Sequence, residues 1–212
     1  MYTPPAFRDD DRASIHAMIA AAGLATLVTM TPEGLIGTPL PLLLAPDEGP
    51  LGTLHGHVAR ANPQWRLAVA GEALAIFAGP DAYVSPGWYA TKAEHGRVVP
   101  TWNYAAVHAY GPVEFYDDPV RLRAVVARLT ERHEAGRASP WSVDDAPEPF
   151  VQAQLKGIVG LRLPIARLEG KRKFSQNRSA ADRAGVVLGL GPTGDPGDAA
   201  AAAAVPLGDR EG

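Results

Sequence analysis

The chain has 212 residues, a formal net charge of −3 and no cysteine, with 46% hydrophobic and 20% charged residues. This is the composition of an ordinary soluble globular protein, and the lack of cysteine excludes disulfides, thiolate metal sites and a cysteine nucleophile. No apolar run approaches the ~18–20 residues of a transmembrane helix, so we expect no membrane association and a cytoplasmic location. The pI of about 6.1 argues against a surface that binds nucleic acid non-specifically.

The first third of the chain is predicted to form a helix followed by strands. The helix covers residues 9–23, because acidic residues favour a helix start and one apolar stripe follows, made of Ile15, Met18, Ile19 and Ala22. Strands are expected over residues 24–30 and 35–44, with Pro32 and Gly34 in the turn between them. A third strand is expected to begin near residue 54 and to lead into a short helix over residues 62–70.

The rest of the chain continues this pattern. Further strands are predicted over residues 72–79, 101–116 and 159–165, and helices over residues 118–136 and 148–155; residues 83–89 either continue the strand over 72–79 or follow a turn after it. Five or six mostly antiparallel strands with a few helices predict a mainly β fold with flanking helices, closed into a barrel. We expect one domain over residues 1–190. The Gly-, Ala-, Pro- and Asp-rich tail, residues 191–212, is expected to be disordered.

The segment HGHVARANPQW, residues 55–65, brings polar side chains to the end of a predicted strand. His55 and His57 share one strand face, and Arg60 and Asn62 follow. Arginine binds phosphate oxygens in pairs, and free N–H groups at a helix start attract anions. This favours a phosphate ligand. A metal site would need further histidine or carboxylate ligands, and a capped helix with ordinary surface residues is the alternative.

Two further segments, YVSPGWY and VPTWNY, combine aromatic rings with hydroxyl and amide groups. Their candidate ligands are Ser85, Trp88, Tyr89, Thr101, Trp102 and Asn103. The serine hydroxyl can donate to an anion, and the aromatic rings can stack on a flat ligand or fill the core. The threonine hydroxyl and the asparagine amide suit the edge of a heteroaromatic ring, because they offer both donors and acceptors.

The segment GKRKFSQNR, residues 170–178, interleaves cations with amide and hydroxyl groups. Its candidate ligands are Lys173, Ser175, Gln176, Asn177 and Arg178. A charge run is usually a solvated surface, but amides between cations indicate a defined anion or ring partner. Together the four segments favour a phosphorylated aromatic cofactor, either FMN or pyridoxal phosphate, although no lysine has a distinctive Schiff-base context. The Rossmann and P-loop glycine motifs are absent.

With the N-terminal MYTPPAF, the blocks HVARANPQW, YVSPGWY, VPTWNY and KFSQNR resemble the signature of the PaiB family. Its members are described as FMN-binding negative transcriptional regulators of bacteria with a split β-barrel like that of the pyridoxamine phosphate oxidases. The blocks occur in order over roughly residues 1–190. The resemblance implies an FMN-binding split β-barrel and a homodimer with FMN between the subunits. The tail after Leu190 has no counterpart in it.

The resemblance also implies roles for the candidate residues. The block with His57, Arg60 and Asn62 corresponds to the loop that grips the FMN phosphate in split-barrel flavoproteins. The block with Ser85, Trp88 and Tyr89 is expected near the flavin or the dimer contact, and Thr101, Trp102 and Asn103 are expected near the isoalloxazine ring. The C-terminal block is expected to reach the cofactor as a lid or from the partner subunit, through Lys173, Ser175, Gln176, Asn177 and Arg178.

Three functions stay open from the sequence. The family resemblance implies a repressor that binds DNA directly or acts through a partner or metabolite, but no helix-turn-helix with a basic recognition helix is found. A flavin-dependent oxidoreductase using NAD(P)H or a small donor is the alternative, although no catalytic residue set is recognised. A flavin-binding redox sensor without turnover is the third. Fold resemblance alone does not decide among them.

Overall fold

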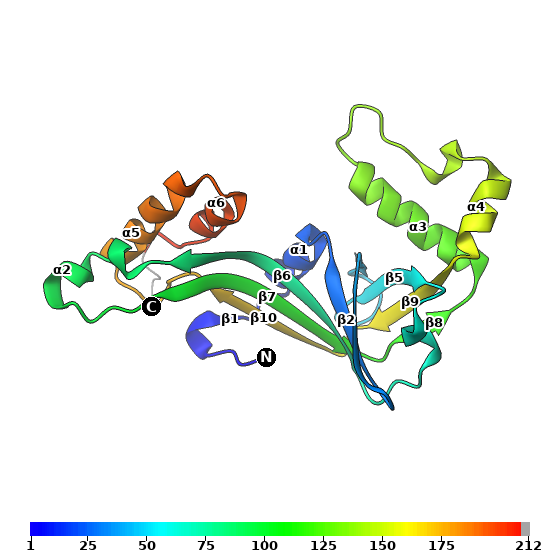
Figure 1. The fold of residues 1–212 in the computed structure, drawn as a ribbon, viewed down its shortest axis with the longest axis horizontal. Coiled ribbons are helices and arrows are strands. Elements are labelled where there is room, and N and C mark those ends of the chain that lie inside the picture. The colour runs from blue at the N-terminus through cyan, green and yellow to red at the C-terminus, as the bar shows by residue number, and fades with distance from the viewer. Residues whose placement is uncertain (209–212) are drawn as a thin grey trace. The chain divides into compact units, whose positions relative to one another are not determined.

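The protein, described over residues 1–208 by a computed structural model, forms two compact units (Figure 1). Unit 1 consists of Met1–Ile15, Ala78–Val107 and the chain from Glu169 onward, and unit 2 consists of His16–Phe77 and His108–Leu168. Two strands, β6 and β7, are shared, because each has one end in unit 1 and the other in unit 2.

The strands within residues 1–208 are β1 (Arg8–Asp9), β2 (Ala25–Thr31), β3 (Gly34–Leu40), β4 (Leu43–Ala45), β5 (Thr53–Ala59), β6 (Ala73–Val84), β7 (Thr101–Gly111), β8 (Glu114–Tyr116), β9 (Ile158–Pro164) and β10 (Arg167–Lys173). The α-helices are α1 (Arg12–Ala21), α2 (Thr91–His95), α3 (Pro119–Glu134), α4 (Glu148–Leu155), α5 (Ala180–Leu190) and α6 (Pro196–Ala203). Short 3-10 helices are η1 (Pro5–Phe7), η2 (Pro63–Arg66), η3 (Pro86–Trp88), η4 (Val143–Asp145) and η5 (Gly191–Thr193).

The strands form two sheets. The six-stranded sheet has the order β1-β10-β7-β6-β2-β3, and the four-stranded sheet has the order β4-β5-β9-β8. The pairings β1–β10, β2–β3, β2–β6 and β5–β9 are antiparallel. In β5 the side chains of Leu54 and Val58 are buried, while the two histidines between and beside them are half-buried on the opposite face. Strand alternation therefore fixes which face of β5 carries the polar groups.

In unit 2 two helices cover the four-stranded sheet. Figure 1 shows α3 lying against β5 and β9, and α4 lying against β9. Asp118 caps α3, because its Oδ1 accepts from the backbone N–H of Val120 at 2.8 Å. Leu122 packs in a core cluster with Tyr116 and residues of α4, and Leu129 packs in a second cluster with a strand residue. The predicted amphipathic stripe is thus the face that packs on the sheet.

In unit 1 the helix α5 packs on the short helix η3, and α6 packs on α5. The approach of α5 to η3 depends on glycine, because a Cβ atom on Gly185 or Gly189 would overlap atoms of Trp88. Asp182 of α5 adds a polar contact, since its Oδ1 accepts from the backbone N–H of Thr91 at 3.0 Å. Helix α5 is therefore docked against the aromatic segment that begins with Tyr83.

Most predicted elements are present with small shifts at their ends. The helices α1, α3 and α4 and the strands β2, β5 and β9 are confirmed. The strand predicted over residues 35–44 is interrupted at Pro41, and the strand over residues 101–116 at Pro112, since proline cannot donate to a sheet. The helix predicted over residues 62–70 is wrong in length, because only Pro63–Arg66 is helical and it is a 3-10 turn.

Residues 191–208, which were predicted to be disordered, contain the short helix η5 and the helix α6 in the structure. Asp195 caps α6 and Pro196 occupies its first position, and alanine then continues the helix well. Ala201 and Val205 are buried, so this segment packs on the rest of unit 1. Residues 209–212 of the predicted tail lie outside the described residues. None of the helices described has the length and apolar character needed to span a bilayer.

Candidate functional site

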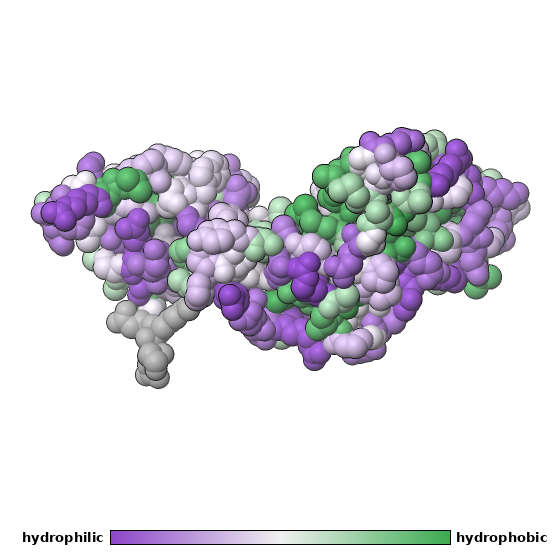
Figure 2. Space-filling model, turned by 90° about the horizontal axis from the view of Figure 1, so that it is seen from below, coloured by the Kyte–Doolittle hydropathy of each residue, from purple (hydrophilic) through white to green (hydrophobic). Residues whose placement is uncertain are grey.

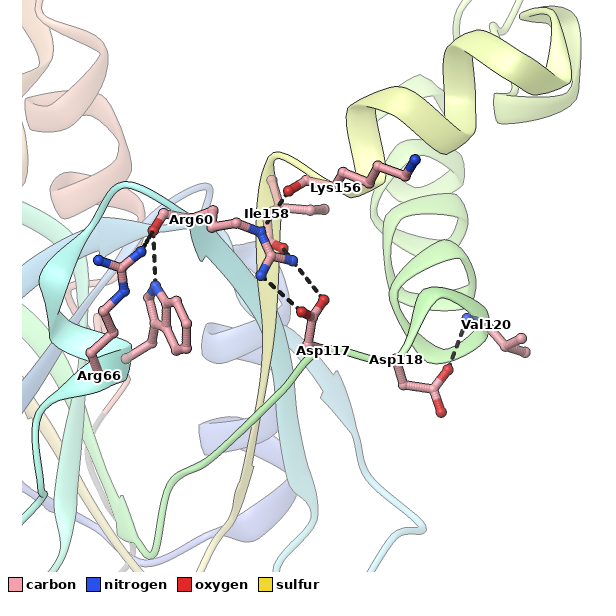
Figure 3. Close-up of polar contacts among 8 residues, drawn as sticks. Arg60, Arg66, Asp117, Asp118, Val120, Lys156 and Ile158 are labelled. Carbon is pink, nitrogen blue, oxygen red and sulfur yellow. Dashed lines mark hydrogen bonds and ion pairs between the residues drawn. The ribbon is translucent and has the colours of Figure 1, made fainter.

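The Arg60 guanidinium is fully engaged in unit 2 (Figure 3). Its Nη1 and Nη2 donate to the two carboxylate oxygens of Asp117 at 2.8 and 2.6 Å. Its Nε donates to the backbone carbonyl of Lys156 at 2.6 Å, and Nη2 also donates to that of Ile158 at 3.0 Å. Each guanidinium nitrogen therefore has a protein oxygen as partner. Arg60 ties the end of β5 to the segments before α3 and β9.

The electrostatics agree with this pairing. The hydrogen bonds from Arg60 hold the pKa of the Asp117 carboxyl below its ordinary value, and the same contact raises the pKa of Arg60. A phosphate at Arg60 would have to compete with a carboxylate that already makes the bidentate contact. The assignment of Arg60 as a phosphate ligand stays a prediction.

Asn62 caps the turn that follows. Its Oδ1 accepts from the backbone N–H of Gln64 at 2.9 Å, and its Nδ2 donates to Thr38 Oγ1 at 3.0 Å. Gln64 is completely buried and donates to Thr29 Oγ1 at 2.9 Å, which anchors the turn on β2. The predicted N-cap role of Asn62 is confirmed, and its amide serves the fold of unit 2.

The two strand histidines differ in their surroundings. His55 Nε2 lies 2.7 Å from Glu48 Oε2, and the other carboxylate oxygen, Oε1, accepts from Arg162 Nε at 2.8 Å. His57 Nδ1 is buried without a hydrogen-bond partner. Burial lowers the pKa of His57, so the ring is held neutral. Within the described part of the chain no three histidine, aspartate or glutamate side chains gather as metal ligands.

The second predicted segment lies in unit 1. Ser85 is the N-cap of η3 and its Oγ accepts from the backbone N–H of Gly87 at 3.1 Å. Trp88 is half-buried against the glycines of α5. Tyr89 is 3% exposed, its hydroxyl has no hydrogen-bond partner, and the guanidinium carbon of Arg178 lies 4.8 Å from the centre of its ring. The structure therefore brings Tyr89 of the second segment to Arg178 of the fourth.

The start of β7 carries the third segment. Thr101 Oγ1 accepts from Lys173 Nζ at 2.5 Å, and the carbonyl of Trp102 accepts from the same ammonium group. The indole of Trp102 is exposed and meets Tyr83 edge to face. Asn103 is completely buried; its Oδ1 accepts from Ser175 Oγ at 3.1 Å, while its Nδ2 has no partner. The third and fourth segments thus meet side by side.

The turn after β10 is built for this contact. Ser175 has φ +58 and is the only non-glycine residue with positive φ among residues 1–208, a conformation that costs energy and is common at ligand sites. Gln176 closes the turn, because its Oε1 accepts from the backbone N–H of Phe174 at 2.6 Å and its Nε2 donates to the carbonyl of Arg172. Asn177 is exposed.

The predicted ligands therefore divide between the units. Three lie in unit 2, namely His57, Arg60 and Asn62, and the structure engages the last two in the fold. The other eleven lie in unit 1 and include the contacts Lys173–Thr101, Ser175–Asn103 and Arg178–Tyr89. Lys171 and Tyr104 lie within the predicted segments GKRKFSQNR and VPTWNY but were not predicted as ligands.

The cations of unit 1 lie close to one another. Burial lowers the pKa of the Lys173 ammonium group, and the nearby charges of Lys171 and Arg178 lower it further. Lys171 Nζ lies 5.0 Å from the centre of the Tyr104 ring, a cation–π contact. Positive charge, aromatic rings and a buried amide with a free N–H are groups that can bind a phosphorylated heteroaromatic ligand.

Solved structures with this fold define the class. The chain matches the FAD and heme binding protein of Mycobacterium smegmatis with a TM-score of 0.57 at 16% identity, covering 78% of this chain and 73% of that one. It matches the flavocytochrome Anf3 of Azotobacter vinelandii with a TM-score of 0.56 at 16% identity, covering 79% and 69%. The predicted fold class is confirmed: two antiparallel sheets with flanking helices, in the split-barrel fold of FMN-binding proteins.

Sequence comparison gives the family. Residues 1–167 match the family described as "Putative FMN-binding domain", and the chain belongs to it. The protein named protease synthase and sporulation protein PAI 2 of Bacillus subtilis is 33% identical over 188 residues, covering 88% of this chain and 87% of that protein. A protein of Emericella nidulans, AN0679, is 34% identical over 222 residues, covering 84% and 88%. The resemblance to PaiB-like proteins is therefore confirmed.

Proposed function

We propose that this protein binds FMN and acts as a PaiB-type regulator of transcription. The observation that carries the flavin proposal is Asn103, a completely buried amide whose N–H groups have no partner. A buried donor without a partner is rare in native proteins, and the polar edge of an isoalloxazine ring offers acceptors for it. Ser175 fixes the orientation of this amide by donating to its oxygen. Membership of the FMN-binding family supports the choice of ligand.

The residues of unit 1 have separate roles in this proposal. Asn103 meets the ring edge, Trp102 offers an exposed aromatic face, and the ammonium group of Lys173 supplies positive charge beside the start of β7. A positive charge near a flavin stabilises its reduced anionic form. When bound, FMN supplies reversible electron transfer, whereas the protein supplies binding, orientation and electrostatic tuning.

The regulatory part of the proposal follows from similarity to the Bacillus protein, whose name refers to protease synthesis and sporulation. Direct DNA binding through α3 is disfavoured by its ion pairs. Arg121 lies 3.2 Å from Glu114, and Arg123 lies 2.6 Å from Asp144 and 3.0 Å from Glu148. Both arginines already face carboxylates, so we favour regulation through a partner or metabolite over phosphate contacts from these two side chains.

We further propose a homodimer with FMN between the subunits, as the family resemblance implies. Large apolar side chains are exposed, including Met30 and Leu35 of unit 2 and Trp102 of unit 1. Figure 2 shows hydrophobic residues gathered on one face of unit 2. Burying such residues is a common driving force for subunit association. Light scattering of the purified protein, with and without FMN, measures the subunit number; a monomer in both states would refute the dimer.

An absorption spectrum of the protein tests the flavin proposal. The protein is purified, mixed with excess FMN and desalted, and the spectrum is taken before and after. Retained oxidised-flavin absorption is expected, with Asn103→Ala losing most of it and Asn177→Ala retaining it, because Asn177 is exposed. A wild-type protein that cannot be loaded would refute FMN binding. Promoter DNA compared with random DNA at several salt concentrations then measures any direct DNA binding.

A further inference from the structure

We infer that unit 2 contains a second ligand site, a pocket that binds a small organic carboxylate between α3 and the four-stranded sheet. This pocket, here called the arginine pocket, has a volume of about 180 Å³. Besides four residues of α3, its lining contains Glu48, His55 and Tyr116. The site is separate from the proposed flavin site, whose residues Asn103 and Lys173 lie in unit 1.

Two arginines line the pocket from one face of α3. Arg121 and Arg128 are two helical turns apart, about 10 Å along the axis, so both side chains leave the helix on the same side. Ala124 and Val125 lie between them, and these short side chains leave room for a ligand. Within residues 1–208 the side chain of Arg128 makes no hydrogen bond and no ion pair. Its charge is therefore available to an anion.

The guanidinium of Arg121 is positioned by two contacts. Its Nη1 donates to Glu114 Oε1 at 3.2 Å, and its central carbon lies 3.7 Å from the centre of the Tyr116 ring. The ring packs closely on β9, because a Cβ atom on Gly160 would come within 2.3 Å of it. A guanidinium has five N–H donors. Among the described residues only Glu114 accepts from this one, so donors remain for a ligand carboxylate.

The carboxylate among the lining residues is already engaged. Glu48 Oε2 lies 2.7 Å from His55 Nε2, and its Oε1 accepts from Arg162 Nε at 2.8 Å. Burial alone would raise the pKa of Glu48, but these hydrogen bonds outweigh burial and lower the pKa, so the group is ionised and Arg162 opposes its charge. The lining thus offers two arginines against one carboxylate that has its own partner.

The apolar part of the lining selects among anions. Val125 is buried and packs with Leu43 and Leu129, and the Tyr116 ring adds an aromatic surface. Inorganic phosphate would leave this surface in water, whereas a carboxylate with a short hydrocarbon body covers it while its oxygens meet the arginines. The volume is below the ~300–1,000 Å³ of typical cofactor and drug sites, so the ligand is small.

NMR titrations, which measure weak binding, test the pocket with butyrate as the probe. Butyramide has a similar shape without the charge, and inorganic phosphate has the charge without a hydrocarbon body. The variants are Arg128→Gln, Arg121→Gln and Ala124→Leu, the last of which fills the pocket and keeps both arginines. The matched control is Arg123→Gln, which removes one charge from the same helix outside the pocket. Melting curves of every variant verify folding.

Wild type is expected to bind butyrate, and butyramide about tenfold more weakly or less. Arg128→Gln and Arg121→Gln should each weaken butyrate about ten- to a hundredfold, the loss expected for a charge-assisted hydrogen bond. Ala124→Leu should abolish binding, and Arg123→Gln should bind as wild type does. No butyrate binding to wild type overturns the site, and so does an equal loss in Arg123→Gln. Phosphate bound as tightly as butyrate overturns the choice of an organic carboxylate.

The same titration with FMN-loaded protein separates this pocket from the proposed flavin site. Unchanged butyrate affinity is expected for two separate sites. Displacement of butyrate by FMN would assign the pocket to the flavin and overturn the inference. If the protein cannot be loaded with FMN, the proposed function fails, while butyrate binding that Arg128→Gln loses still supports the arginine pocket.

Discussion

Replacing Gly185 by alanine tests the docking of α5 on η3. A Cβ atom at this position would approach the Trp88 carbonyl oxygen closer than 3.0 Å, and the carbonyl carbon at 3.2 Å. The obstacle is backbone, so no side-chain rotation relieves it, and α5 must move. Overpacking costs about 1–3 kcal/mol, and an overlap with backbone puts this position in the upper part of that range, at about 2–3 kcal/mol, against a gain of about 1 kcal/mol from the higher helix propensity of alanine. A net loss of about 1–2 kcal/mol follows.

Urea unfolding followed by tryptophan fluorescence measures this loss. With a slope of about 2 kcal/mol per molar urea, the unfolding midpoint should fall by roughly 0.5–1 M. The control is Gly191→Ala, since Gly191 has helical φ and ψ and no atom lies within 4 Å of its Cβ position. It should be neutral or slightly stabilising. Equal midpoints for Gly185→Ala and wild type would refute the docking of α5 on Trp88.

Four further outcomes follow from the structure. Burial lowers the pKa of His57 below its ordinary 6.5, so the unfolded chain takes up a proton at a higher pH than the folded chain does. The free energy of unfolding should therefore fall as the pH drops below 6.5. In urea titrations at several pH values, His57→Gln should flatten this dependence on pH. Arg60→Met and Asp117→Asn should each lower the melting temperature, and the double variant should melt close to Arg60→Met, because Asp117→Asn removes only a contact that Arg60→Met has already removed; additive losses would contradict this coupling. FMN affinity, measured against pH, should decline as Lys173 deprotonates, at a lower pH than for Lys173→Arg. Truncation after residue 190 exposes the surface under Val205 and should cost about 2 kcal/mol, seen as an earlier urea midpoint.

The elements found from the sequence are those whose local pattern matches their packing. Helix α3 has an acidic cap, proline at its first position and one apolar stripe, and each of these features is used in the structure. Strand β10 was missed for the opposite reason. Its residues Arg167–Lys173 are mostly charged, so no alternation of apolar side chains marks it. Its burial comes from neighbouring strands, and Gly170 and Lys171 are buried between them.

The candidate site was predictable in its residue types but not in its pairings. An asparagine before Pro63 predicts a cap, and the cap is present. Nothing near Arg60 in the sequence identifies Asp117 as its partner, because the two are 57 residues apart. The same holds for Lys173 and Thr101, which are 72 residues apart. Such pairs are set by strand order, and strand order depends on the whole chain.

The partners of the basic side chains differ between the segments 55–65 and 170–178, and this difference indicates different roles. A cation that meets a carboxylate and backbone carbonyls, as Arg60 does, is neutralised within the folded chain and holds segments together. Within residues 1–208 Lys171 and Lys173 are buried or fixed without an acidic partner, so their positive charge stays available to an anionic ligand. In the sequence both kinds look alike, since each is a basic residue beside asparagine and aromatic side chains. The partner of each charge, and not the motif around it, therefore distinguishes a structural cation from one that is available to an anionic ligand.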